Sequence, residues 1–381
     1  MDAILVRFSH VFARCHLWAL SALALGWVPG LSRLDDRNRK RFGYCCLMSH
    51  GNPAVRRCFL RVLQRDIDKS IDINLCLAEV AWLIDDTAEA RAIYQRTIAL
   101  DGTKEEQQEA QCMARFTEDL LDGRCNESVR GQIERQEIPD PTRGPLVVTL
   151  VSSRYMEMFR LWAAQAKKHL AARIVVMALD EESESTLAAE FDCNIIRMSQ
   201  YFVFGEDKRI GRYCRRNIWM MRVLLLQELV ARGYEVISLD LDAIIVGDVA
   251  GMLASFMKTD IVAQKDYSIP VDAARKLGFI VCCGFMVIRS NTRAIAFMER
   301  YRLRTNRELD DQLGLNHLLV AEGLSSRTRQ HGHMTFECGG VSWACPDEQL
   351  VSRDVHFGTV IRHFQQHGQS MEQLRNELGL S

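Results

Sequence analysis

The sequence predicts an α/β fold, in which a mixed, mostly parallel sheet is flanked by helices and preceded by an all-α N-terminal region. After residue 145, short apolar runs rich in β-branched residues alternate with helical patterns, which is the order typical of a parallel sheet covered on both faces. Before residue 139, almost every segment repeats its apolar residues with a helical period. Residues 139–145 form a short polar stretch that contains three prolines, Pro139, Pro141 and Pro145, as is typical of a linker. We therefore predict a helical domain at 1–138, a linker at 139–145 and an α/β domain at 146–381.

The clearest helices of the N-terminal region form a pair within residues 75–100, on either side of a polar turn at 85–87. Small residues at Ala78, Ala81 and Ala90 would let these two helices approach closely. Four residues follow the spacing of a tetratricopeptide repeat: Leu77, Ala78, Ala90 and Tyr94. This resemblance implies that the helices bind a protein partner. Such repeats need about three copies to bury a continuous core, and the flanking segments match only loosely, so a plain helical bundle is the alternative.

The cellular location is predicted from the N-terminus and the cysteines. Residues 16–31 are apolar, but they fall short of the ~20 residues that a membrane-spanning helix needs, which favours a buried or interfacial helix. The 13 cysteines contain no Cys-x-x-Cys pair, which favours a reduced, intracellular setting. We predict a cytoplasmic protein, with peripheral attachment to a membrane or an N-terminal anchor in the secretory pathway as alternatives. The net charge of −1 argues against nucleic acid as a partner.

Within the α/β region the predicted elements follow one another regularly. Runs of β-branched residues predict strands at 146–151, 174–179, 193–196 and 236–239. Helical patterns predict helices at 155–170, 183–191 and 218–232, and later from residues 292 and 310. A further apolar strand at 279–289 is interrupted by Gly284. A glycine inside a strand predicts a β-bulge or a place where a ligand meets the backbone.

The strand at 236–239 ends in two carboxylates, Asp240 and Asp242, which are separated by one residue. Charge buried beside an apolar strand is costly unless it is paired or bound to a cation, and a turn can direct both carboxylates to one ion. Oxygen ligands of this kind suit Mn²⁺ or Mg²⁺, which usually keep coordination positions for phosphate oxygens. The motif therefore predicts a site for a metal–diphosphate complex. The alternative is that the two residues only cap a turn.

Other polar residues stand where a ligand of such a sheet would bind, beyond the carboxyl ends of the strands. The ends of the first two predicted strands carry Ser152, Ser153 and Asp180. His356 follows a short strand and is a candidate third metal ligand, although a lone histidine more often makes only a hydrogen bond. Asp311 and Gln312 open a helix, where acidic residues are also ordinary capping groups.

In this order, the elements resemble the GT-A class of nucleotide-sugar glycosyltransferases, and in particular the nucleotide-diphospho-sugar transferase family with a DxD strand. The resemblance covers residues 146–364 and rests on six stretches: VVTLVSSRYMEMFRLW, IVVMALDEES, RGYEVISLDLDAIIVGDV, CCGFMVIRSNTRAI, DDQLGLNHLL and VHFG. The residues after the DxD depart from the family pattern, because Gly247-Asp248-Val249 replaces its usual ending. The acceptor therefore stays open.

The resemblance implies a nucleotide-sugar donor, with a UDP-sugar favoured, and a glycan, lipid-linked or protein acceptor. It implies Mn²⁺ or Mg²⁺ held by Asp240, Asp242 and His356. It places six residues at the donor: Ser152, Ser153, Asp180, Arg222, Gly284 and Gln312. Arg222 stands where the family usually has Lys and would contact phosphate or sugar. Asp311 would be the carboxylate base of an inverting enzyme, whereas a retaining route, towards which the resemblance leans, would use the leaving phosphate.

Two other classes of function compete with this interpretation. In a phosphohydrolase of the haloacid-dehalogenase type, Asp240 would be the nucleophile. That class places the DxD strand near the start of its domain, whereas several strand–helix units precede it here. A scaffold with an inactive transferase domain is the second alternative, and the intact pair of carboxylates argues against it.

Overall fold

The computed structural model describes residues 71–83, 85–136, 138, 140–170, 173–267, 269–330, 332–352, 359–364 and 375–376. The predictions for residues 16–31 and for His356 lie outside these residues. The chain divides into two compact units, one made of residues 1–122 with 210–214 and the other of residues 123–209 with 215–381. Each unit is described by itself.

The described part of the first unit is helical, as predicted, with α5 (Ile71–Leu83), α6 (Thr87–Thr97) and α7 (Lys104–Leu121). Asp86 caps α6, and Thr103 with Glu106 forms a capping box on α7, so both helices begin where their sequences satisfy the first backbone N–H groups. The three predicted small residues, Ala78, Ala81 and Ala90, are all 0% exposed, as close packing of α5 on α6 requires. The likeness to a tetratricopeptide repeat stays a prediction.

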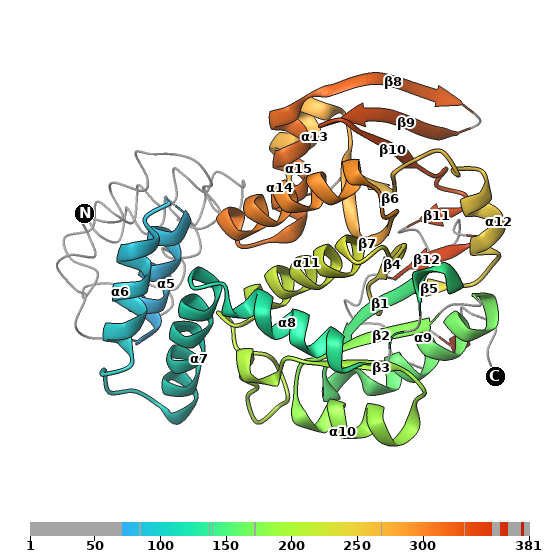
Figure 1. The fold of residues 1–381 in the computed structure, drawn as a ribbon. Coiled ribbons are helices and arrows are strands. Elements are labelled where there is room, and N and C mark those ends of the chain that lie inside the picture. The colour runs from blue at the N-terminus through green and yellow to red at the C-terminus, as the bar shows by residue number, and fades with distance from the viewer. Residues whose placement is uncertain are drawn as a thin grey trace. The chain divides into compact units, whose positions relative to one another are not determined.

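The second unit contains a nine-stranded sheet (Figure 1). Its strands, in spatial order, are β3 (Asn194–Arg197), β2 (Arg173–Ala178), β1 (Leu146–Val151), β4 (Val236–Leu239), β7 (Ile280–Ile288), β6 (Ile261–Asp266), β10 (Val341–Cys345), β9 (His333–Cys338) and β8 (Leu324–Gln330). The first four of these pair in parallel, β7 is antiparallel to both of its neighbours, and β10 is parallel to β6. The sheet is therefore mixed, and the five predicted strands lie at its centre and on the β3 side.

Helices cover both faces of this sheet, which confirms the predicted α/β class (Figure 1). On one face lie α8 (Arg124–Arg135), α11 (Arg215–Ala231), α14 (Thr292–Glu308) and α15 (Asp311–Glu322). The other face carries α9 (Met156–His169), α10 (Glu181–Glu190) and α12 (Val249–Ala254). A short helix, α13 (Val271–Leu277), joins β6 to β7.

A small second sheet brings the C-terminal part of the described chain to the end of β4. It has the order β11 (Val351–Ser352), β12 (Ile361–His363) and β5 (Ala243–Ile245). Its apolar residues join the main core: Ile244 and Ile361 are 0% exposed and belong to one cluster with Trp162 of α9 and Phe285 of β7. Burial of β5 and β12 in this core fixes the turn between β4 and β5, which contains Asp240 and Asp242.

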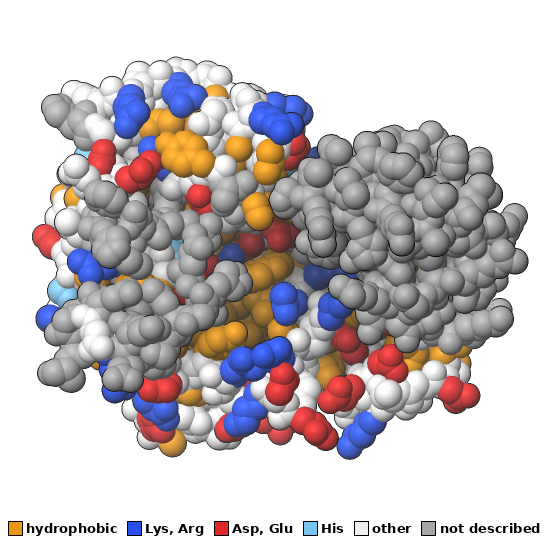
Figure 2. Space-filling view, turned by 180° about the vertical axis from the view of Figure 1, so that it is seen from behind, with side chains coloured by type: hydrophobic (Ala, Val, Ile, Leu, Met, Phe, Trp, Pro, Cys, Tyr) orange, Lys and Arg blue, Asp and Glu red, His pale blue; other side chains and the backbone are white. Residues whose placement is uncertain are grey.

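The face drawn in Figure 2 shows no large patch of a single charge, and the cysteines of the described residues form no disulfide. Acidic and basic side chains are interspersed on the face drawn in Figure 2, in agreement with the net charge of −1. None of the described helices is both long and apolar enough to cross a membrane. The cysteines within the described ranges are free thiols, and most of them are buried.

Candidate metal centre and donor site

Asp240 and Asp242 lie in a tight turn that follows the fully buried strand β4. The backbone N–H of Asp240 donates to Gly284 O at 2.9 Å, and the N–H of Ala243 donates to Asp240 O at 3.0 Å. The carbonyl of Asp242 accepts a hydrogen bond from the Phe364 N–H at 2.7 Å. These bonds anchor the turn to β7 on one side and to the end of β12 on the other. The turn thereby holds the two carboxylates close to each other, with 31% of the Asp240 side chain and 19% of the Asp242 side chain exposed.

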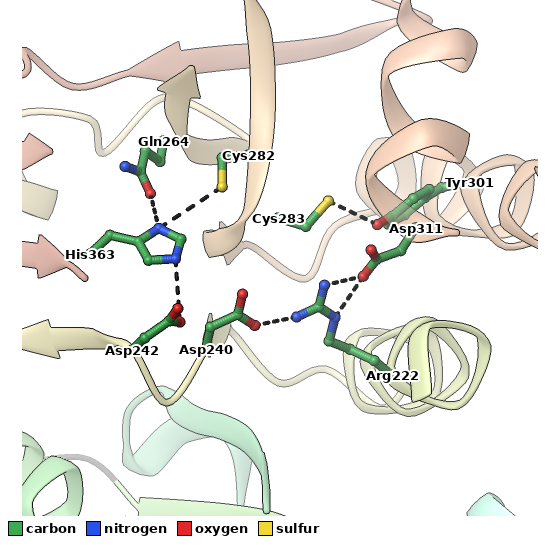
Figure 3. Close-up of polar contacts among 9 residues, drawn as sticks. All are labelled: Arg222, Asp240, Asp242, Gln264, Cys282, Cys283, Tyr301, Asp311 and His363. Carbon is green, nitrogen blue, oxygen red and sulfur yellow. Dashed lines mark hydrogen bonds and ion pairs between the residues drawn. The ribbon is translucent and has the colours of Figure 1, made fainter. Parts of the chain in front are cut away.

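His363 is the third member of this group, and the sequence interpretation missed it. Ligand atoms of Asp240, Asp242 and His363 all lie within 4.8 Å of one another. The Nε2 atom of His363 is 3.3 Å from Asp242 Oδ1, and its Nδ1 is 2.8 Å from Gln264 Oε1 on β6 (Figure 3). His356, the predicted third ligand, lies outside the described residues. A signal for His363 existed, because it stands in the short apolar run VIRHF, where an inward-facing histidine needs a polar partner.

The imidazole of His363 is buried, with 2% of its side chain exposed. Burial by itself would lower the pKa of His363, but the hydrogen bond to Asp242 and the nearby Cys282 raise it to about 10. In this arrangement Asp242 stabilises the protonated ring. A bound cation would take the place of that proton, because a ligating imidazole must be neutral.

Gly284 leaves the space that this group needs. The ladder between β6 and β7 shifts register there, since Ala263 pairs with Met286 while Gln264 pairs with Cys282. The β-bulge predicted at Gly284 is thus present as a shift in pairing, while β7 itself runs unbroken from Ile280 to Ile288. A Cβ atom at residue 284 would lie 2.2 Å from His363 Cε1 and 3.0 Å from Asp240 Oδ2. Only glycine fits between the histidine and the carboxylate.

Arg222 of α11 connects Asp240 to Asp311, the first residue of α15 (Figure 3). Its Nε donates to Asp311 Oδ2 at 2.7 Å, its Nη2 donates to the same oxygen, and its Nη1 donates to Asp240 Oδ1. The ring of Trp219 lies 5.1 Å from the guanidinium carbon, within range of a cation–π contact. Arg222 and Asp311 are each only 3% exposed.

The charges of this buried pair support each other. Burial alone would lower the pKa of Arg222, but the two carboxylates raise it, so the guanidinium stays charged. Burial raises the pKa of Asp311 to about 6 against the opposing effect of Arg222. Asp311 is therefore ionised at neutral pH, and its charge balances that of Arg222.

The remaining predicted residues occupy two other places. Ser153 donates its backbone N–H to Asp180 Oδ2 at 2.8 Å, so the ends of β1 and β2 are tied together beside the buried Ser152. Asp180 also caps α10 through Ser183, which is the ordinary capping role. These strands end at the same edge as β4, because β1 pairs in parallel with both β2 and β4. Gln312 donates to Ile269 O at 2.7 Å instead of to the metal-ligand group.

The group made by Asp240, Asp242 and His363 fits a divalent cation. Two carboxylates and one imidazole are a donor set that Mn²⁺ accepts readily and Mg²⁺ can use in part. The missing side chain at Gly284 keeps the space between these donors free of carbon atoms. The chemistry of the donor set and the glycine beside it both agree with a metal centre.

Comparisons with known proteins identify the family of the chain. None of the curated proteins matches it. Among solved structures, the apo form of mouse xyloside xylosyltransferase 1 shares 13% identity over 45% of this chain and 80% of that chain, with a TM-score of 0.29, a likeness too slight to support an argument. The family model for nucleotide-diphospho-sugar transferases matches residues 169–364, just over half of the chain and most of the second unit. The chain therefore belongs to the nucleotide-diphospho-sugar transferase family, and its activity is that of a glycosyltransferase.

Proposed function

We propose that this glycosyltransferase depends on a divalent cation and takes its sugar from a nucleoside-diphosphate sugar, with a UDP-sugar favoured. The observation that carries the proposal is the group of Asp240, Asp242 and His363, whose ligand atoms lie within 4.8 Å of one another. They would hold Mn²⁺ or Mg²⁺ at the edge of the sheet where the parallel strands end, which is where α/β sheets bind their ligands. His363 takes the position for which the sequence favoured His356.

The bound ion would offset negative charge on the departing nucleoside diphosphate. Around it, the residues of the chain supply binding and orientation. Asp240 and Asp242 bind the ion, and Gly284 keeps the space beside it clear. We assign the nucleotide side of the donor to the tied strand ends that carry Ser152, Ser153 and Asp180.

Asp311 has surroundings that suit a supporting role better than that of a base on the acceptor. One of its oxygens accepts two N–H groups of Arg222, and the residue is 3% exposed. A general base must reach the hydroxyl proton that it removes. The burial of Asp311 thus favours the retaining route, in which the leaving phosphate takes the proton of the acceptor hydroxyl.

The acceptor is a hydroxyl group of a glycan, a lipid-linked sugar or a protein, and Gln312 is assigned to its side of the transferred sugar. The helices of the first unit are proposed to bind a protein partner. Removal of residues 1–138 is a poor test of this role, because α8 packs on α11 within the transferase unit. A better test is to substitute exposed positions of α6, for example Arg91→Ala, and to measure the use of acceptors.

The proposal is tested by thermal unfolding of the parent protein with Mn²⁺ or Mg²⁺ and with UDP or GDP, since a ligand that binds only the folded state raises its stability. We expect metal-dependent stabilisation by a nucleoside diphosphate that is lost in Asp240→Asn and Asp242→Asn. Asp248→Asn is the matched control, because this exposed carboxylate lies on the same segment and asparagine keeps its capping of α12.

Failure of every nucleoside diphosphate to stabilise the parent protein would overturn the proposal and favour the scaffold. Hydrolysis of a generic phosphate ester that disappears in Asp240→Asn would instead support the phosphohydrolase alternative. Slow, metal-dependent hydrolysis of UDP-sugars by the parent protein is the result expected of a transferase without its acceptor.

A further inference from the structure

Arg222 places a permanent positive charge directly on a proposed metal ligand. Its Nη1 donates to Asp240 Oδ1 (Figure 3). A Cβ atom placed at Gly284 would meet Oδ2 of the same carboxylate and the ring of His363, so Oδ2 faces that side. The two oxygens of Asp240 thus serve different partners. One holds the guanidinium, and the other lies on the side of the proposed ion.

A fixed cation beside a metal ligand would weaken metal binding unless its charge were balanced. Two like charges repel strongly at such short range when both are shielded from water, and Arg222 is 3% exposed. Without Asp311, Asp240 and Asp242 together with Arg222 would carry a net charge of only about −1. Asp311 restores the net charge to about −2, which matches a divalent cation.

We propose that Asp311 is a positioning residue of the metal centre: its carboxylate holds Arg222 on Oδ1 of Asp240 and cancels its charge, so that Asp240 and Asp242 keep their full attraction for the ion. The inference rests on the proposed metal site. It gives Asp311 a role that acts through Arg222 and Asp240 and needs no contact with the acceptor.

The geometry around Arg222 agrees with this role. Asp311 receives two of the N–H groups of Arg222 and Asp240 receives one, so Asp311 is the main anchor of the guanidinium. The guanidinium carbon of Arg222 also lies over the ring of Trp219, 5.1 Å from the ring centre. Arg222 comes from α11, Asp240 from the end of β4 and Asp311 from α15. One buried ion-pair network therefore joins three elements directly beside the metal ligands.

The test is a measurement of Mn²⁺ affinity in the full chain, by the loss of the free-Mn²⁺ electron paramagnetic resonance signal. Asp311→Asn removes the charge but keeps the size of the side chain, and we expect it to weaken Mn²⁺ binding by at least about 10-fold. The double variant Arg222→Met with Asp311→Asn removes both charges and restores the balance. We expect its Mn²⁺ affinity to return to within about 3-fold of the parent value, although donor use need not recover.

Glu190→Gln is the control for the loss of one carboxylate. Glu190 forms an exposed ion pair with Arg160 and is not part of the network around Arg222, so this variant should leave Mn²⁺ binding unchanged. Thermal unfolding of each variant checks that it is folded. If Asp311→Asn does not fold, the double variant still decides, because a weakened Mn²⁺ affinity there would show that charge balance is not what matters.

Unchanged Mn²⁺ affinity in Asp311→Asn would overturn the inference, whether or not transfer is lost, and would leave the proposed metal site in place. Absence of Mn²⁺ binding in the parent protein would overturn the proposed metal site and this inference with it. Only the first of these results leaves the proposed function intact, so the two failures are distinguishable.

Discussion

Asn316 of α15 binds both polar backbone atoms of Val281 on β7. Its Oδ1 accepts from the Val281 N–H and its Nδ2 donates to Val281 O, each at 2.8 Å. The neighbouring strand β4 pairs with β7 only from Phe285 onward and does not reach Val281. The side chain of Asn316 therefore supplies the hydrogen bonds that the backbone groups of Val281 need. The same Nδ2 donates to Gln312 O at 2.8 Å, which fixes the first turn of α15 and therefore Asp311.

Replacement of Asn316 by Ala should cost about 2–4 kcal/mol of unfolding free energy, because it leaves buried backbone groups of Val281 without partners. Urea unfolding measures this loss. Gln132→Ala is the matched control, since its amide makes one exposed bond to Arg197 O at 3.3 Å, and it should change stability by less than about 0.5 kcal/mol. Equal losses in the two variants would contradict the structural role of Asn316.

Gly284→Ala should disrupt metal and donor binding. A Cβ atom there meets both His363 and Asp240, so one of the two must move away from its position. We expect metal-dependent stabilisation by a nucleoside diphosphate to be lost in thermal unfolding. Gly131→Ala, within helix α8, is the matched control: its Cβ would lie no closer than 3.4 Å to Arg135 Nη1, and alanine should stabilise the helix by about 0.5–1 kcal/mol. Normal ligand binding by Gly284→Ala would show that the space beside the two ligands is not needed.

Much of this architecture was predictable from the sequence, because strands buried on both faces carry continuous β-branched runs. The strand β4 was predicted with its correct bounds for this reason. The strand β8 was not predicted. It lies at the edge of the sheet, and its residues from Ser325 to Gln330 are exposed, so it has no pattern of burial to detect.

The candidate site was predictable in part, for a similar reason. Asp240 and Asp242 could be identified from the sequence because two charged residues directly follow an apolar strand. His363 and the pairing of Arg222 with Asp311 depend on contacts between elements far apart in the sequence. Arg222 and Asp311, for example, are separated by 89 positions. No local pattern encodes such a contact. The sequence pointed to several individual site residues, but which of them contact one another became visible only in the folded structure.

His317 should make stability depend on pH. Its Nδ1 lies 3.1 Å from Glu308 Oε1, and its Nε2 lies 3.2 Å from Asp272 Oδ2. Burial alone would lower the pKa of His317, but the two carboxylates raise it above its ordinary value of 6.5. The protonated ring is thus favoured in the folded state. Its contribution is complete below about pH 6 and declines as pH rises from 6.5 through the raised pKa.

Unfolding free energies of the parent protein and of His317→Gln, measured between about pH 5.5 and pH 9, test this expectation. The parent should be more stable by on the order of 1 kcal/mol at the acidic end, a modest value because Asp272 is 62% exposed. The difference should shrink towards the alkaline end. A difference that grows with pH would have the opposite sign and would contradict the assigned ion pairs.

The identity of the third metal ligand can be decided between two histidines. His363→Gln should weaken Mn²⁺ binding by about 10- to 100-fold, because it removes an imidazole whose Nε2 lies beside Asp242. His356→Gln is the matched comparison, since it makes the same change at the histidine that the sequence favoured. We expect it to keep the affinity of the parent protein. Titration of Mn²⁺ into each variant measures both values, and thermal unfolding separates lost ligation from lost folding. If His356→Gln loses Mn²⁺ and His363→Gln keeps it, the bond between His363 and Asp242 supports the turn and does not extend the metal site.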